Sequence, residues 1–262
     1  MSSSNRGYQT LRVQTDGGVA TIAIHRPDRK NAIGPLTINE LLYAFEDSRD
    51  DASTRVVVLT GTGAVFSAGG DLGHMASGTG PALPPKGGFP ELLLAFGDLG
   101  KPTIAAIPGP AMGGALGLIA ACDFALATES ATFGTPEIKR GLFPMMIMAP
   151  IMRVVPRREL LSMMLLGEVF PATEAARIGL INRVVPDGTL DAEVGKLAAR
   201  LCTQSPTALR MGLRAFHHQQ DQALAEALPY LQEQLFAILG TEDANEGLKA
   251  FMEKRQPIWT GR

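Results

Sequence analysis

The chain has 262 residues, of which 45% are hydrophobic, and a formal net charge of −2. This length allows one large domain, or one domain with an appendage, around a sizeable core. The near-neutral charge argues against a general nucleic-acid-binding protein, which would carry an excess of basic residues. The two cysteines, Cys122 and Cys202, form neither a disulfide framework nor a metal-binding pattern, and they favour a reducing, cytoplasmic compartment.

No segment is typical of a targeting peptide or a membrane span. The first six residues are polar, and no apolar stretch follows them. The longest apolar run covers residues 142–152 and is interrupted by Pro144 and Pro150, so it is too short and too broken to cross a bilayer. We therefore expect a soluble protein that does not act at a membrane.

The first part of the chain alternates patterns typical of strands and helices. The run Val56-Val57-Val58-Leu59 lacks polar alternation, which is typical of a strand covered on both faces. Pro35 stands near the first turn of a predicted helix, where proline is tolerated. The alternation predicts α/β layers. We expect strands at residues 19–24, 55–60, 103–107, 123–127 and 181–185, helices at 35–49, 91–99 and 113–122, and a Gly- and Pro-rich loop at 77–88.

The last part of the chain has a different character. Helical periodicity dominates from residue 187 onward. We predict a core domain over residues 1–195 and a mostly helical region over residues 196–262. The helices expected there cover residues 190–202, 206–218, 224–239 and 242–255.

Two glycine-rich turns carry the main functional signal. The first has the sequence Phe66-Ser67-Ala68-Gly69-Gly70-Asp71-Leu72, and the second Gly109-Pro110-Ala111-Met112-Gly113-Gly114-Ala115. Each follows a predicted buried strand. Two backbone N–H groups that converge from separate segments form an oxyanion hole, which stabilises negative charge on a carbonyl oxygen. The predicted helix near Gly113 adds the positive end of its dipole, and glycine lets a substrate carbonyl come close.

Several motifs, in order, resemble those of the enoyl-CoA hydratase/isomerase (crotonase) family. They are the first glycine turn, residues 101–109 through Cys122-Asp123, Phe133-Gly134-Thr135-Pro136-Glu137, residues 175–182, and the tail at residues 242–262. The resemblance covers nearly the whole chain. It implies an α/β fold in which β-β-α units form a crotonase-like spiral. It also implies that the helical region at 196–262 mediates trimerisation, so that the protein is a homotrimer or homohexamer.

The resemblance also assigns catalytic roles by position. The N–H groups of Gly70 and Gly114 would hold the thioester oxygen of an acyl-CoA while an enolate forms. Hydratases of the family use two glutamates. The second corresponds to Glu137, whereas the position of the first is occupied here by Gly117.

This departure leaves the reaction open. A paired acid and base suit the addition of water across a double bond, whereas a single carboxylate suits a shuttle that moves a proton between two carbons. Two reactions therefore remain as alternatives: hydration of a 2-enoyl-CoA, and isomerisation of a β,γ to an α,β double bond. Decarboxylation or thioester hydrolysis is a third option. A binding protein that kept the acyl-CoA site and lost turnover is an alternative of another class.

Further residues are candidates for substrate binding by the same resemblance. Ala68 lies two residues before the first donor, and Arg26, Arg29, Lys30 and Lys254 would meet the phosphates of CoA. The alternative is that these cationic side chains are solvated at the surface and bind no ligand. After Pro144, hydratases commonly carry a glycine-rich stretch, whereas this chain has Met145-Met146-Ile147-Met148. Phe143, Met145 and Met146 would line an apolar acyl pocket, since methionine fills irregular apolar space. Plain core packing is the alternative for these three.

The sequence lacks the motifs of metal binding, of a serine nucleophile and of dinucleotide binding. His25, His74 and the pair His217-His218 do not show metal-ligand spacing. Ser67 lacks the G-x-S-x-G elbow of a serine nucleophile, and residues 61–64 do not complete a dinucleotide-binding G-x-G-x-x-G. We expect neither a metal nor a separate cofactor, because coenzyme A is part of the substrate.

Overall fold

The main sheet has six strands in the order β1-β2-β3-β4-β6-β9. The computed structural model describes residues 6–71 and 83–262, so His74 and residues 77–82 of the expected loop lie outside the described residues. β1 pairs antiparallel with β2, and the other neighbouring strands pair parallel. The strands are β1 (Leu11–Asp16), β2 (Val19–Ile24), β3 (Val56–Gly61), β4 (Thr103–Ile107), β6 (Phe124–Thr128) and β9 (Arg183–Val185).

Helices cover both faces of this sheet, and alternate residues of each strand serve the two faces. On β3, Val57 and Leu59 belong to the large core cluster with α1, α2 and α3, whereas Val56 and Val58 pack with α7. This confirms that the Val-Val-Val-Leu run is buried on both sides. The helices are α1 (Pro35–Asp50), α2 (Phe89–Leu99), α3 (Gly114–Ala121), α4 (Met148–Ile151), α5 (Arg157–Leu166), α6 (Ala172–Arg177) and α7 (Leu190–Cys202), with 3₁₀ turns η1 (Pro27–Arg29) and η2 (Pro136–Arg140).

A second, smaller sheet follows the main one along the chain. β5 (Ala111–Met112) comes after β4 and pairs parallel with β7 (Thr132–Gly134), which comes after β6. β8 (Val169–Pro171) pairs antiparallel with β7. Ahead of β5, single parallel bridges join Ser67 to Ala111 and Ile33 to Gly70. Each turn of the chain thus contributes a long strand, a short extended segment and a helix, which is the predicted spiral of β-β-α units.

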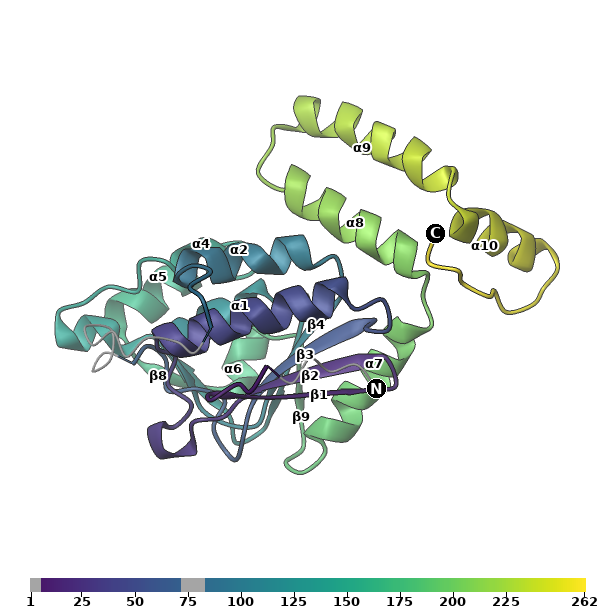
Figure 1. The fold of residues 1–262 in the computed structure, drawn as a ribbon. Coiled ribbons are helices and arrows are strands. Elements are labelled where there is room, and N and C mark those ends of the chain that lie inside the picture. Colours follow the sequence, from purple (N-terminus) through teal and green to yellow (C-terminus); the bar gives the residue numbers. More distant parts are fainter. Residues whose placement is uncertain (1–5, 72–82) are drawn as a thin grey trace.

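Three helices project from the sheet layers (Figure 1). They are α8 (Pro206–Gln219), α9 (Leu224–Leu239) and α10 (Glu242–Met252). α8 contacts α2 of the core, and α9 and α10 pack on α8 and on each other. The buried carboxylate of Asp243 accepts hydrogen bonds from the Ser205 hydroxyl and from the N–H groups of Thr260 and Gly261, which fixes the tail against α8 and α10.

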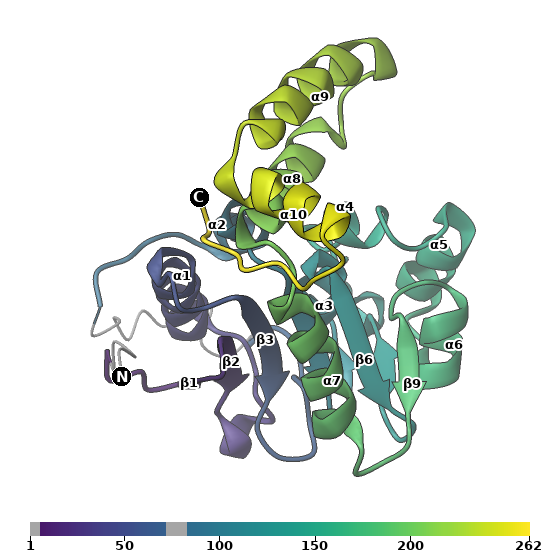
Figure 2. The same ribbon diagram turned by 90° about the vertical axis from the view of Figure 1, so that its right-hand side faces the viewer.

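The longer predicted elements are confirmed, and the shortest ones were not predicted. β2, β4, α7 and α9 have the expected bounds, whereas β1, β5, β7, β8 and α4 to α6 lack a counterpart in the predictions. The predicted boundary at residues 195 and 196 falls within α7, which packs on the main sheet (Figure 2), and the division into two regions stays a prediction. Among the described residues, no helix is both long enough and apolar enough to cross a membrane.

Candidate active site

The two glycine turns leave the second sheet side by side. Ser67 and Ala111 form a parallel bridge, in which the Met112 N–H donates to the Ser67 carbonyl at 3.0 Å. Gly70 lies three residues beyond Ser67, and Gly114 lies three residues beyond Ala111. The two glycines therefore lie at the same distance along the chain from the bridge. A Cβ built on Gly114 would lie 3.8 Å from the backbone nitrogen of Gly70. The structure therefore brings the two predicted donor residues together.

The residue before each donor must be glycine. Gly69 has a φ of +89° and Gly113 a φ of +53°, a backbone region that other residues rarely adopt. A Cβ on Gly69 would lie 2.5 Å from the carbonyl oxygen of Met112, and one on Gly113 would lie 2.6 Å from Oε1 of Glu137. Both turns thus have a glycine with positive φ before the donor, and each glycine is packed too closely to accept a side chain.

Both donor N–H groups point away from their own hydrogen-bonded neighbours. The Gly69 carbonyl accepts from the N–H of Ile33, and the Asp71 N–H donates to the Ile33 carbonyl. Because the groups of successive extended residues alternate in direction, the Gly70 N–H points away from Ile33. Gly114 is the first residue of α3, where an N–H has no partner within the helix. Neither N–H donates to another of the described residues, and Gly70 is exposed while Gly114 is half-buried.

Glu137 reaches the same place from the next strand of the small sheet. β7 runs parallel to β5, so the segments that follow them leave the sheet at one edge. The Gly113 N–H donates to the Gly134 carbonyl at 2.8 Å, and η2 then carries Glu137 against Gly113. Glu137 is half-buried, and its Oε2 atom is buried without a hydrogen-bond partner among the described residues.

Burial raises the pKa of the Glu137 carboxyl above its ordinary value of 4.5. Desolvation is the main cause, because it disfavours the charged form. A hydrogen bond from its own backbone and the positive charge of Arg140 oppose the shift. A carboxyl group with a raised pKa is suited to accept a proton and later release it.

The cations predicted to bind CoA are in different situations. The Arg26 guanidinium donates to the Ala32 carbonyl at 2.6 Å and pairs with Asp71 at 2.8 Å, so it ties the loop that follows β2 to the first glycine turn. Arg29 and Lys30 are exposed on the same loop, and the Ala68 N–H donates to the Lys30 carbonyl at 2.9 Å. The structure therefore joins the backbone of Lys30 to that of Ala68, two residues before Gly70, and Arg29 precedes Lys30 on the same loop.

The remaining predicted substrate-binding residues lie on other segments. Lys254 is exposed just beyond α10, on the projecting helices, and no described contact joins it to Lys30. Phe143 is partly buried and packs against the large core cluster. Met145 and Met146 are 63% and 46% exposed, so in one chain they present apolar side chains to solvent.

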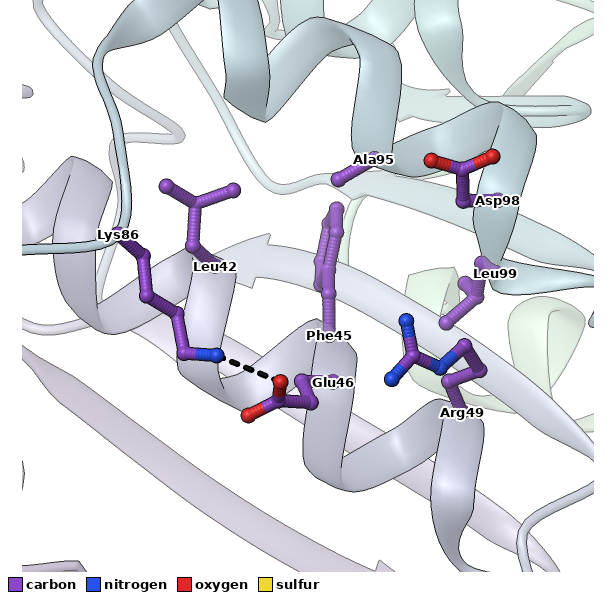
Figure 3. A pocket seen from close by; sticks show the side chains of 8 residues that line it. All are labelled: Leu42, Phe45, Glu46, Arg49, Lys86, Ala95, Asp98 and Leu99. Carbon is purple, nitrogen blue, oxygen red and sulfur yellow. Dashed lines mark hydrogen bonds and ion pairs between the residues drawn. The ribbon is translucent and has the colours of Figure 1, made fainter.

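Two cavities lie away from Glu137. One of about 190 Å³ lies between α1 and α2, and an ion pair of 2.5 Å between Lys86 and Glu46 spans its lining (Figure 3). A larger one of about 1140 Å³ lies where α2, α3 and α4 face α8 and α9. Neither cavity is lined by Gly70, Gly114 or Glu137. The candidate active site is therefore defined by the convergence of donors and carboxylate.

Residues considered for other chemistries have structural contacts. In residues 6–71 and 83–262, no cluster of His, Cys, Asp and Glu side chains could hold a metal ion. Nδ1 of His25 lies 3.1 Å from the hydroxyl of Thr62, and the ring of His218 contacts Tyr230. Ser67 is fully buried, and its hydroxyl accepts from the Gly69 N–H, so it stabilises the first turn.

A profile of the enoyl-CoA hydratase/isomerase family matches residues 14–262. The chain belongs to this family. It is 34% identical to a probable enoyl-CoA hydratase of Mycobacterium bovis, over 97% of this chain and 99% of the relative. It is 35% identical to a carnitinyl-CoA dehydratase of Escherichia coli, again over 97% of this chain and 99% of the relative.

Solved structures agree with this assignment. The crystal structure of an enoyl-CoA hydratase from Mycobacterium smegmatis superposes with a TM-score of 0.87 at 32% identity, covering 95% of this chain and 98% of that one. The human enoyl-CoA hydratase domain-containing protein 3 gives a TM-score of 0.88 at 26% identity, covering 96% and 100%. The protein is an enzyme of the hydratase/isomerase family with the crotonase fold.

Sequence reasoning missed two contacts of the site. The ion pair of Arg26 with Asp71 joins residues that are 45 positions apart, and Ile147 covers Gly117 across 30 positions. The sequence around a charged residue near a turn, or around an isoleucine in an apolar run, does not indicate which distant residue it contacts.

The raised pKa of Glu137 predicts a pH dependence of folding stability. Between its unfolded and folded pKa values the folded chain binds more protons, so the free energy of unfolding falls as pH rises through that window. Glu137→Gln removes the ionisable group, so the variant does not lose stability in this way. We expect the stability of this variant relative to the wild type to increase as pH rises from the ordinary glutamate range. Urea denaturation at a series of pH values and one protein concentration measures it. The raised pKa would be contradicted if the difference in unfolding free energy between Glu137→Gln and the wild type stayed constant with pH. It would also be contradicted if that difference equalled the one measured for Glu129→Gln, at an exposed position.

Proposed function

We propose that the chain acts on acyl-CoA thioesters, with the N–H groups of Gly70 and Gly114 as an oxyanion hole and Glu137 as the acid/base. The supporting observation is the meeting of three segments. The nitrogen of Gly70 lies beside Gly114, and the carboxylate of Glu137 lies against Gly113. Donors fixed by the backbone need no reorganisation when charge develops on the thioester oxygen.

The proposed chemistry begins with a proton taken from the carbon next to the thioester carbonyl. The electron pair left behind places negative charge on the carbonyl oxygen, and the two N–H groups and the N-terminal end of α3 stabilise it. Glu137 accepts the proton and returns it. Gly69 and Gly113 hold the donors in place, because their backbone shape and packing fix the direction of the next N–H.

The same machinery serves hydration of a 2-enoyl-CoA or isomerisation of a 3-enoyl-CoA. Relatives named as hydratases and a dehydratase support the first reaction. Gly117, which lacks a carboxylate, supports the second. In this proposal coenzyme A enters as part of the substrate, and no separate cofactor takes part.

The substrate contacts are proposed from the same arrangement. Arg29, Lys30 and Ala68 would meet the phosphates and pantetheine of CoA, and the hydrogen bond from the Ala68 N–H to the Lys30 carbonyl, two residues from Gly70, supports this. Arg26 acts through Asp71 as a positioning residue. Phe143, Met145 and Met146 follow η2 and would form the apolar wall for the acyl chain. Lys254 would reach a CoA bound to a neighbouring chain.

We also propose that the protein forms a homotrimer or homohexamer. Four leucines with helical spacing lie along one face of α9, and each is 48–74% exposed in a single chain. Exposed apolar stripes of this kind mark surfaces that another protein covers. The leucines are Leu224, Leu228, Leu235 and Leu239.

The role of Glu137 is tested by Glu137→Gln, which keeps the size of the side chain and removes its basicity. We expect a loss of about 10²–10⁴-fold in kcat on whichever substrate the wild type uses, because general acid/base catalysis contributes that much. The assay follows purified enzyme with a 2-enoyl-CoA and with a 3-enoyl-CoA. Glu129→Gln, a substitution at an exposed position, is the control and keeps full activity. Tight CoA binding without turnover by the wild type would indicate a binding protein instead.

The oxyanion hole is tested at Gly114, where one substitution removes the N–H and another keeps it. Proline is tolerated at the first position of a helix, so Gly114→Pro deletes the donor. In Gly114→Ala the N–H remains, and the added Cβ makes ordinary contacts, 3.7 Å from Phe89 at the closest. We expect kcat of the proline variant to lie about 10²–10³-fold below that of the alanine variant. Equal activity of the two would exclude this N–H as a donor.

Oligomerisation is tested by the charge pair Leu228→Glu/Leu235→Glu. We expect the wild type to run at three or six times the chain mass of 27.8 kDa in light scattering, and the variant at the mass of one chain. These leucines are exposed in one chain, so the fold is retained. Ala237→Glu, on another face of α9, is the control and leaves the mass unchanged. A monomeric wild type would contradict the proposal.

A further inference from the structure

Gly113, the residue before α3, and Gly117, within α3, are each covered by a side chain from another element. The Oε1 atom of Glu137 lies 2.6 Å from the position of a Cβ on Gly113, and Cγ2 of Ile147 lies 2.5 Å from that of a Cβ on Gly117. Glu137 and Ile147 therefore pack against positions four residues apart in the chain, at the N-cap and on the first turn of α3.

Ile147 leaves no room for a side chain at residue 117. Its Cβ also lies only 3.0 Å from the Cβ position of Gly117, and the residue is 3% exposed at the start of α4. A branched hydrocarbon thus fills the space at position 117, where a second carboxylate would stand. Among the described residues, Arg140 is the ionisable side chain whose charge affects Glu137.

We propose that Ile147 is a specificity-determining residue, which by packing on Gly117 leaves Glu137 as the single acid/base and makes 3-enoyl thioesters the substrate class. This inference rests on the proposed function of Gly70, Gly114 and Glu137, and it selects one of the two reactions. The enzyme converts a 3-enoyl thioester into the conjugated 2-enoyl thioester. Water addition is the slower reaction.

The isomerisation balances with one carboxylate. Glu137 takes a proton from C2, and the C–H electron pair forms a C1=C2 bond while the carbonyl electron pair moves onto the thioester oxygen. The oxyanion, held by the N–H groups of Gly70 and Gly114, then reforms the C1=O bond. The C1=C2 pair shifts to C2=C3, and the former C3=C4 pair takes the proton from Glu137 at C4. No atom is gained or lost.

Hydration sets a different demand. Water must lose a proton as its oxygen bonds to C3, and C2 must gain a proton. Two groups divide these tasks well, whereas one carboxyl group must perform both on the same face. Burial of Glu137 favours the protonated form, so the carboxyl holds its proton between the two steps of an isomerisation.

The decisive experiment restores the second carboxylate. Ile147→Gly removes the obstructing atoms, and Gly117→Glu/Ile147→Gly adds a glutamate in the space they leave. The readout is the ratio of the initial rate of hydration of a 2-enoyl-CoA to that of isomerisation of the 3-enoyl-CoA with the same acyl chain. We expect isomerisation to dominate in the wild type and in Ile147→Gly, and the ratio to rise by about 10²-fold or more in the double variant.

Three results would overturn the inference. One is a wild type that hydrates faster than it isomerises. Another is a double variant with the same ratio as Ile147→Gly. The third is a single Gly117→Glu variant that gains as much hydration as the double variant, because Ile147 would then not be the obstacle. Ile151→Ala, which also removes buried apolar volume from α4, is the packing control and leaves the ratio unchanged.

A wild-type measurement keeps the inference testable if the variants do not fold. With a 3-enoyl-CoA that carries deuterium at C2, a single carboxyl that moves the proton delivers part of the label to C4 of the product. Complete loss of the label to water would overturn the inference. If Glu137→Gln retained full activity, the proposed function itself would fail, and this outcome is distinct from Glu137-dependent hydration by the wild type.

Discussion

The parallel pairing of Ser67 with Ala111 is the contact on which the candidate site depends. It sets the register between two chain segments, so that Gly70 and Gly114, 44 positions apart, leave the small sheet at one level. A slip of one residue would turn each N–H to the opposite side of its segment, because successive residues alternate in direction. The parallel pairing of β5 with β7 does the same for Glu137, which leaves the neighbouring strand at the same edge.

The site is built largely from positions without side chains. At Gly69 the Met112 carbonyl occupies the space of a Cβ, at Gly113 the Glu137 carboxylate does, and at Gly117 the Ile147 side chain does. Interiors are packed to the density of organic crystals, so each missing side chain lets another group approach the backbone closely. Glycine thereby fixes the distance between α3 and the segments that pack on it, as well as the backbone shape of the turns.

Family membership and reaction are separate questions for this protein. The family and the fold establish an acyl-CoA enzyme, yet one fold supports several reactions, and the groups beside the reacting carbons decide among them. In the proposed mechanism the choice depends on what occupies position 117 of α3, where a second carboxylate would stand. The contact between Ile147 and Gly117 places hydrocarbon there. In the proposed mechanism, the choice of reaction therefore depends on this packing as well as on the absence of a carboxylate at residue 117.

The sequence by itself determined the long elements, and it predicted the central residues of the candidate site. β2, β4, α7 and α9 follow from periodicity and β-branched runs, and the ordered glycine and Phe-Gly-x-Pro-Glu motifs single out Gly70, Gly114 and Glu137. The tertiary structure alone decided the two- and three-residue strands β5, β7 and β8, the pairing of Arg26 with Asp71, and the cover that Ile147 gives Gly117. The physical reason is range. Propensity and periodicity act over a few neighbouring residues, whereas these contacts join groups dozens of positions apart and form only once the strands are in register and the helices are packed.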